Sequence, residues 1–152
     1  MAFRIAGHPV HPALVHFPIA LWTVSVAADA ASTAGLDVDP AYAYAALVAG
    51  LAFSALALLA GFIDYALLRA DHPAQRTATL HMMAMTGAAT LFLVSAWLRG
   101  GPATPPAGAL ACSAAGWVAL LAGGWLGGTL VYRYGVAVES AEEISPSRHP
   151  SP

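Results

Sequence analysis

Long apolar stretches alternate with short polar segments along this chain. The apolar stretches cover about residues 13–33, 41–68, 77–98 and 109–131. A helix needs roughly 20 mostly apolar residues to cross the hydrocarbon core of a bilayer, and each stretch reaches that length. The pattern therefore predicts an all-α integral membrane protein with four transmembrane helices.

The polar segments between these stretches are too short to hold further structure. They read GLDVDP (35–40), RADHPAQR (69–76) and GGPATPPAG (100–108). Short connections place consecutive helices side by side and antiparallel, so we expect an up-down-up-down four-helix bundle. We expect one transmembrane domain over residues 1–138. Residues 139–152 are polar and rich in Pro and Ser, which predicts a disordered tail.

Composition supports the membrane class and excludes several others. The chain has 152 residues, of which 59% are hydrophobic and 9% are charged, whereas soluble domains contain about 25% charged residues. The net charge is −2, lysine is absent and no basic cluster is present, so nucleic acid is not an expected partner. The single cysteine, Cys112, excludes an internal disulfide and the Cys-x-x-Cys-His attachment of a c-type haem.

The arginines predict an orientation in the bilayer. In an up-down-up-down bundle both termini and the second connection share one membrane face. That face carries five arginines and the opposite face only Arg99, and the five are Arg4, Arg69, Arg76, Arg133 and Arg148. The positive-inside rule then places both termini in the cytoplasm.

The first apolar stretch also resembles a signal peptide, because Arg4 precedes it and ADAAS (28–32) imitates a cleavage site. However, His16 and Pro18 interrupt the apolar run, so we expect this segment to be retained.

Ionisable side chains gather on the same face. The first helix brings His8, His11 and His16, the second Asp64, and the third His81. Ionisable groups at membrane depth cost roughly 3 kcal/mol and usually face the bundle interior with partners. His16 and His81 both fall inside apolar runs, on helices that point the same way, so we expect this pair to meet a common ligand. Pro9 and Pro12 predict a non-helical lead-in through His8 and His11.

Glycines on the fourth helix form two overlapping G-x-x-x-G pairs. These are Gly123 with Gly127 and Gly124 with Gly128. Such pairs allow close packing of helices in membranes. They also leave room for a flat ligand against the backbone, and both interpretations stay open at this point.

Three functional hypotheses follow from these residues. In the first, a b-type haem is held between His16 and His81 and carries electrons. Asp64 or a backbone carbonyl would fix the imidazole tautomer. Arginines would pair with the haem propionates and glycines would accept the macrocycle edge, the candidates being Arg69, Arg76, Arg133, Gly124 and Gly128.

In the second hypothesis, a non-haem Zn, Fe or Cu ion binds to the side chains of His8, His11, His16, Asp64 and His81. In the third, the protein is a structural subunit of a larger membrane complex. No nucleophile–base pair, phosphate loop or carboxylate dyad is evident, so we do not expect an autonomous enzyme. No inverted repeat is visible, which makes a transporter the weaker interpretation.

The run HPVHPALVHFP, residues 8–18, resembles the opening signature of a bacterial membrane family, domain of unknown function 2231. The similarity continues through GFIDY (61–65), His81 and GGTLVYRYGVAV (127–138). The resemblance implies four membrane helices in the bacterial inner (cytoplasmic) membrane. Because members occur fused to cytochrome c or Rieske-type domains, it also implies redox partners. The family pattern often has a histidine at position 134, a glycine at 137 and a polar residue at 85, where this chain has Tyr134, Ala137 and Met85.

Overall fold

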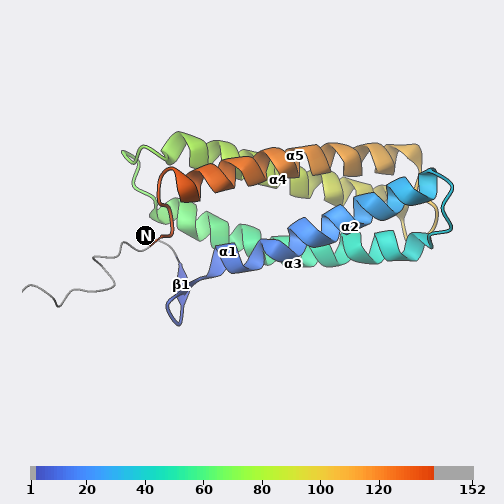
Figure 1. Ribbon diagram of the computed structural model, residues 1–152, viewed down its shortest axis with the longest axis horizontal. Helices are drawn as coiled ribbons and strands as arrows, with labels where there is room; N and C mark the ends of the chain where they lie inside the picture. The colour runs from blue at the N-terminus through green and yellow to red at the C-terminus, as the bar shows by residue number, and fades with distance from the viewer. Residues whose placement is uncertain (1–2, 139–152) are drawn as a thin grey trace, which may run out of the picture.

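The protein folds into two antiparallel helical hairpins that lie side by side. The computed structural model describes residues 3–138. Its helices are α1 (Val10–Leu14), α2 (His16–Thr33), α3 (Pro40–Leu67), α4 (Gln75–Arg99) and α5 (Ala107–Tyr132), and a small antiparallel hairpin, β1 (Arg4–Ile5) with β2 (His8–Pro9), precedes them. Figure 1 shows the α2–α3 and α4–α5 connections at one end, and β1, the α3–α4 connection and the end of α5 at the other.

Four helical segments have the length and apolar composition needed to cross a membrane. They are Val10–Thr33, Pro40–Leu67, Gln75–Arg99 and Ala107–Tyr132. The predicted all-α four-helix bundle is therefore confirmed, with helix boundaries a few residues from those expected. The tail predicted for residues 139–152 lies outside the described residues.

The entry to the first span differs from the expected non-helical lead-in. Residues Val10–Leu14 are helical and contain both His11 and Pro12. Pro12 is the third residue of α1 and Pro18 the third residue of α2. The first N–H groups of a helix have no intrahelical partner, so proline costs little there. The expectation holds for His8, which lies with Pro9 in β2. It is wrong for His11, because Pro12 falls in the first turn of α1 and that helix brings His11 into the bundle.

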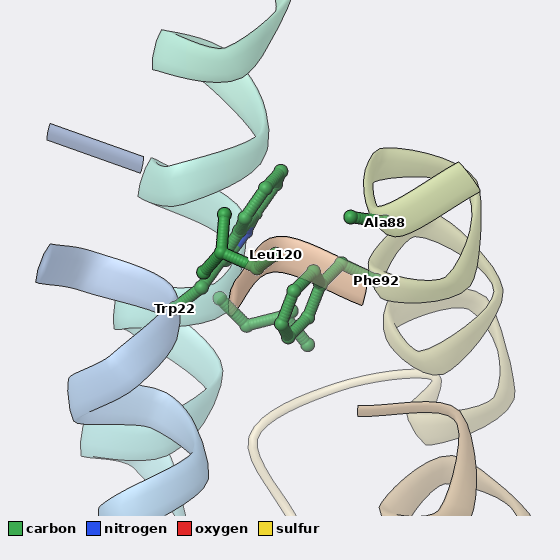
Figure 2. Packing of buried hydrophobic residues seen from close by; sticks show 5 residues of the cluster. Trp22, Ala88, Phe92 and Leu120 are labelled. Atoms are coloured by element: carbon green, nitrogen blue, oxygen red, sulfur yellow. The ribbon is translucent and has the colours of Figure 1, made fainter. Parts of the chain in front are cut away.

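An aromatic layer holds the two hairpins together at mid-bundle. The rings of Trp22 and Phe92 stack with centroids 4.3 Å apart and planes inclined by 17°. Leu47, Ala88 and Leu120 complete this buried cluster. Figure 2 shows the packing of the cluster from close by. Stacked aromatic pairs contribute about 0.5–1.5 kcal/mol beyond the area they bury.

A buried ion pair closes the end of the bundle opposite the termini. The Arg99 guanidinium donates hydrogen bonds to both carboxylate oxygens of Asp29, Nη1 at 3.1 Å from Oδ1. The side-chain exposure is 0% for Arg99 and 7% for Asp29. The hydroxyls of Ser95 and Ser113 also accept from this guanidinium. Asp29 is thus not the solvated end-of-helix residue that its position beside Ser32 and Thr33 would suggest, because Arg99 reaches it from α4.

Candidate functional site

Two imidazole rings meet between the hairpins near the end that carries the termini. They belong to His11 on α1 and His81 on α4, with ring centroids 6.2 Å apart and planes inclined by 82°. His16 does not take part, because its side chain is exposed and its Nδ1 lies 3.4 Å from the carbonyl of Ala13 in its own helix. The expected pairing of His16 with His81 is therefore wrong. The partner of His81 is His11.

Each ring of the pair is oriented by a backbone carbonyl of the neighbouring helix. His11 Nδ1 donates to the carbonyl oxygen of Ala57 on α3 at 2.8 Å. His81 Nδ1 donates to the carbonyl oxygen of Gly123 on α5, also at 2.8 Å. A carbonyl oxygen only accepts, so Nδ1 carries a proton, and in the neutral form of each ring Nε2 is the nitrogen free to bind a metal. A histidine that binds a metal through Nε2 usually donates its Nδ1–H to a carbonyl or carboxylate in the same way.

A glycine lies under each ring, one helical turn after the carbonyl. A Cβ added at Gly61 would stand 2.9 Å from Cε1 of His11, and one at Gly127 would stand 3.1 Å from Cε1 of His81. Both distances are shorter than ordinary carbon–carbon contacts. The absence of a side chain at these two positions is therefore what lets the imidazoles reach the helix backbone. Gly61 and Gly127 had no assigned role in the expected site.

A cavity of about 240 Å³ lies beside the two histidines. Its lining is mostly apolar and comes from all four spans, and includes Val15, Tyr65, Met82, Met85, Gly124 and Gly128. Ile19 on α2 and Gly124 and Val131 on α5 also line it and are solvent-exposed in the isolated chain. The cavity therefore opens between α2 and α5, on a side of the bundle that faces lipid. Gly124 and Gly128, for which close helix packing and contact with a flat ligand were both left open, line this cavity.

Asp64 lines the cavity but does not orient a histidine. Its Oδ1 accepts a hydrogen bond from the backbone N–H of Phe3 at 2.6 Å. The carbonyl of Phe3 in turn accepts from the N–H of Val10 at 3.1 Å. Asp64 therefore ties the chain before the β1–β2 hairpin to the bundle beside the cavity. The backbone carbonyls of Ala57 and Gly123 orient the imidazoles, which is the role considered for Asp64.

The three arginines expected at the site do not line the cavity. Arg69 forms an exposed ion pair with Asp71 at 2.7 Å, Arg76 is exposed, and the Arg133 guanidinium lies 5.7 Å from the centre of the Tyr134 ring. Arg4 contacts the lining instead, because its Nη2 donates to the carbonyl of Ala137 at 3.2 Å. The sequence placed Arg4 on the correct face, but its contact depends on how the chain end folds back.

The four histidines proposed for a non-haem metal are not gathered. His8 is exposed and its Nδ1 is bonded to the carbonyl of Ala6 at 3.0 Å, and His16 faces away from the bundle. Within residues 3–138, no group of three or more His, Cys, Asp or Glu side chains stands close enough to hold a metal ion. A haem needs only two protein ligands, because the porphyrin supplies the other four.

The spacing of the His11–His81 pair fits two ligands of a single metal. Two imidazoles bound on opposite sides of one metal have ring centres about 6 Å apart, since the metal–nitrogen bond is about 2.0 Å and the ring centre lies about 1 Å behind the nitrogen. The observed separation of the centroids is 6.2 Å. The tautomers, the spacing and the adjoining apolar cavity are thus all compatible with bis-imidazole ligation.

The fold and the site define a four-helix membrane protein with a paired-imidazole site in one half of its bundle. The chain belongs to the family described as predicted membrane protein (DUF2231), whose model matches residues 7–140. No curated protein and no solved structure matches the chain. The family assignment confirms the resemblance carried by residues 8–18, and its description specifies a membrane protein without an activity.

Proposed function

We propose that this protein binds one haem b between His11 and His81 and carries electrons in a bacterial membrane. The observation that carries the proposal is the pair of carbonyl-bonded imidazoles whose centres are 6.2 Å apart. A bound haem would supply one-electron chemistry through its iron. The chain's own residues would set its position and its reduction potential through ligand orientation and burial.

The role of each neighbouring group follows from its contacts. The carbonyls of Ala57 and Gly123 hold Nδ1 protonated, which increases the electron density at Nε2. Gly124 and Gly128 leave space beside the pair for the macrocycle. Arg4, which contacts the cavity lining at Ala137, is the arginine best suited to neutralise a propionate.

The cellular setting is part of the same proposal. Arg4, Arg69, Arg76 and Arg133 lie at the terminus-bearing end, and Arg99 at the other end is buried in an ion pair. This distribution supports an inner-membrane location with both termini in the cytoplasm. The partners would be redox proteins of the cytochrome c or Rieske type, or a larger membrane redox complex.

An absorption spectrum of the protein purified in detergent tests the function. We expect a Soret band that shifts when dithionite reduces the iron, and a haem content near one per chain. Substituting His11→Ala or His81→Ala should abolish the haem signal, whereas His16→Ala is the matched control and should leave it unchanged. A colourless protein with stoichiometric metal would instead favour a non-haem site, and a colourless protein without metal would favour a structural subunit.

A further inference from the structure

The inward-facing residues of the two hairpins follow one pattern. Along α1 and α2 these residues are spaced four and three apart, as in a coiled coil, and they are His11, Val15, Pro18, Trp22, Ser25 and Asp29. Each has a counterpart 70 residues later on α4, namely His81, Met85, Ala88, Phe92, Ser95 and Arg99. The register is the same from His11 to Asp29 and from His81 to Arg99.

The second helices of the hairpins correspond in the same way, with an offset of 66 residues. Ala43, Gly50, Ala57 and Gly61 on α3 match Ala109, Gly116, Gly123 and Gly127 on α5. The difference of four between the two offsets arises near the turn of each hairpin, mainly because α2 continues to Thr33, four residues past Asp29, whereas α4 ends at Arg99. The second hairpin therefore repeats the inward face of the first.

Equivalent residues make equivalent contacts inside their own hairpins. His11 and His81 bond the equivalent carbonyls of Ala57 and Gly123. Ser25 and Ser95 donate to the equivalent carbonyls of Ala43 and Ala109, at 2.8 and 2.9 Å. Trp22 lies against Gly50, and Phe92 against Gly116. These matched contacts make the second hairpin a structural repeat of the first.

Equivalent residues also meet each other across the bundle. The three pairs are His11 with His81, Trp22 with Phe92 and Asp29 with Arg99. A residue touches its own counterpart only when both lie beside the two-fold axis that relates the copies. Both hairpins start at the same end of the bundle (Figure 1), so this axis runs parallel to the helices, as in parallel repeats of membrane proteins. The imidazole pair therefore sits on the axis.

The cavities on the two sides of this axis differ in size. The cavity beside His11 and His81 measures about 240 Å³ between α2 and α5. Its counterpart on the other side, which Leu58 lines, measures about 20 Å³. Leu58 and Phe62 on α3 correspond to Gly124 and Gly128 on α5. The larger cavity thus lies where the second copy carries glycine in place of a large side chain.

We propose that the site is a two-fold site built from two copies of one hairpin, each supplying an imidazole, and that Gly124 and Gly128 are its specificity-determining residues. Because the second copy lacks the large side chains of Leu58 and Phe62, these glycines widen the site on one side and accept the edge of a flat macrocycle that enters through the lipid-facing gap between α2 and α5. This inference rests on the proposed haem function, because it assigns the residues that set the size and the entry side of that ligand.

A substitution guided by the repeat tests the inference. The double variant Gly124→Leu, Gly128→Phe introduces the residues that the first copy has at these positions. No atom lies within 4 Å of a Cβ built at Gly124, and only Tyr132 Cδ2, at 3.9 Å, approaches one at Gly128, so neither substitution begins with a clash at Cβ. Gly87→Leu is the matched control, because it adds similar bulk to α4 at a position with nothing within 4 Å and outside the cavity lining.

The measurement is a hemin titration of the full-length apoprotein in detergent, followed by the Soret band, with helix content and melting recorded by circular dichroism. We expect the double variant to bind hemin at least tenfold more weakly than the wild type, and Gly87→Leu to bind it with wild-type affinity. The melting temperatures of both variants should be no lower than that of the wild type. The milder Gly124→Ala, Gly128→Ala variant should give an intermediate loss. Wild-type affinity in the double variant would overturn the inference. A wild type that binds no hemin would instead overturn the proposed function and, with it, the inference.

Discussion

The buried pair of Asp29 and Arg99 gives a prediction whose size follows from its burial. Neither side chain is more than 7% exposed, and the guanidinium meets both carboxylate oxygens. Removing one member of such a pair typically costs about 3–5 kcal/mol, because the other charge stays buried without compensation. Replacing both members by apolar residues of similar volume is often close to neutral.

We therefore expect Arg99→Met to lower the free energy of unfolding by about 3 kcal/mol or more, and Asp29→Leu to do the same. The double variant should lie within about 1–2 kcal/mol of the wild type, so the two effects should be strongly non-additive. Ser95 and Ser113 keep each other and the carbonyl of Ala109 as partners in all three variants, at 2.8 and 2.9 Å, so these hydroxyls add little to the loss.

Reversible unfolding in mixed detergent and SDS micelles, followed by far-UV circular dichroism, measures these free energies. The four proteins form a double-mutant cycle, which isolates the interaction from the separate effects of each substitution. Single variants within about 1 kcal/mol of the wild type would contradict a desolvated pair. A double variant as unstable as the sum of the singles would show that the two side chains act independently.

Three further predictions concern the contacts of the bundle and the site. Gly50→Ala places a Cβ 2.5 Å from Trp22 Cδ1 and should destabilise the protein by about 1–3 kcal/mol in the same unfolding assay, while the control Gly87→Ala meets nothing within 4 Å and should be neutral or stabilising. Asp64→Ala removes the acceptor of the Phe3 N–H and should speed amide hydrogen exchange in residues 3–9. Asp64→Asn retains an acceptor oxygen and should leave the exchange rates unchanged. Equal exchange rates in the two variants would contradict the claim that Asp64 ties this segment to the bundle. Gly61→Ala and Gly127→Ala should each displace one imidazole from its carbonyl and weaken haem binding, and unchanged spectra in both would contradict the role of these glycines.

The fold was accessible from the sequence because its cause is local. Four apolar stretches of membrane-spanning length and three short connections leave few alternatives to an antiparallel bundle. The face on which the histidines gather follows from the same connectivity. Neither result depends on the detailed packing of any side chain.

The identity of the ligand pair was less accessible, although one signal was present. Counting back from Trp22 in steps of four and three leads through Pro18 and Val15 to His11, which puts His11 on the inner face and leaves His16 off it. Pro9 and Pro12 argued against this reading, because proline usually interrupts a helix. Here Pro12 falls in a first turn, where its missing N–H has no consequence.

The pairing of Asp29 with Arg99 and the contacts of the imidazoles with carbonyls required the three-dimensional structure. Both join residues that are 42–70 positions apart in the sequence. Such contacts depend on how closely two helices approach, which the glycines at positions 61 and 127 decide. The glycine pattern signalled close packing but did not reveal that imidazoles were the groups being packed.

Electron paramagnetic resonance of the oxidised, haem-loaded protein tests the central claim most directly, because it reports the ligands of the iron. We predict a low-spin ferric signal, typical of two imidazole ligands, in the wild type and in His16→Ala. His11→Ala and His81→Ala should each lose that signal, through conversion to high spin or loss of the haem. A low-spin signal that survives in His11→Ala and disappears in His16→Ala would contradict the account.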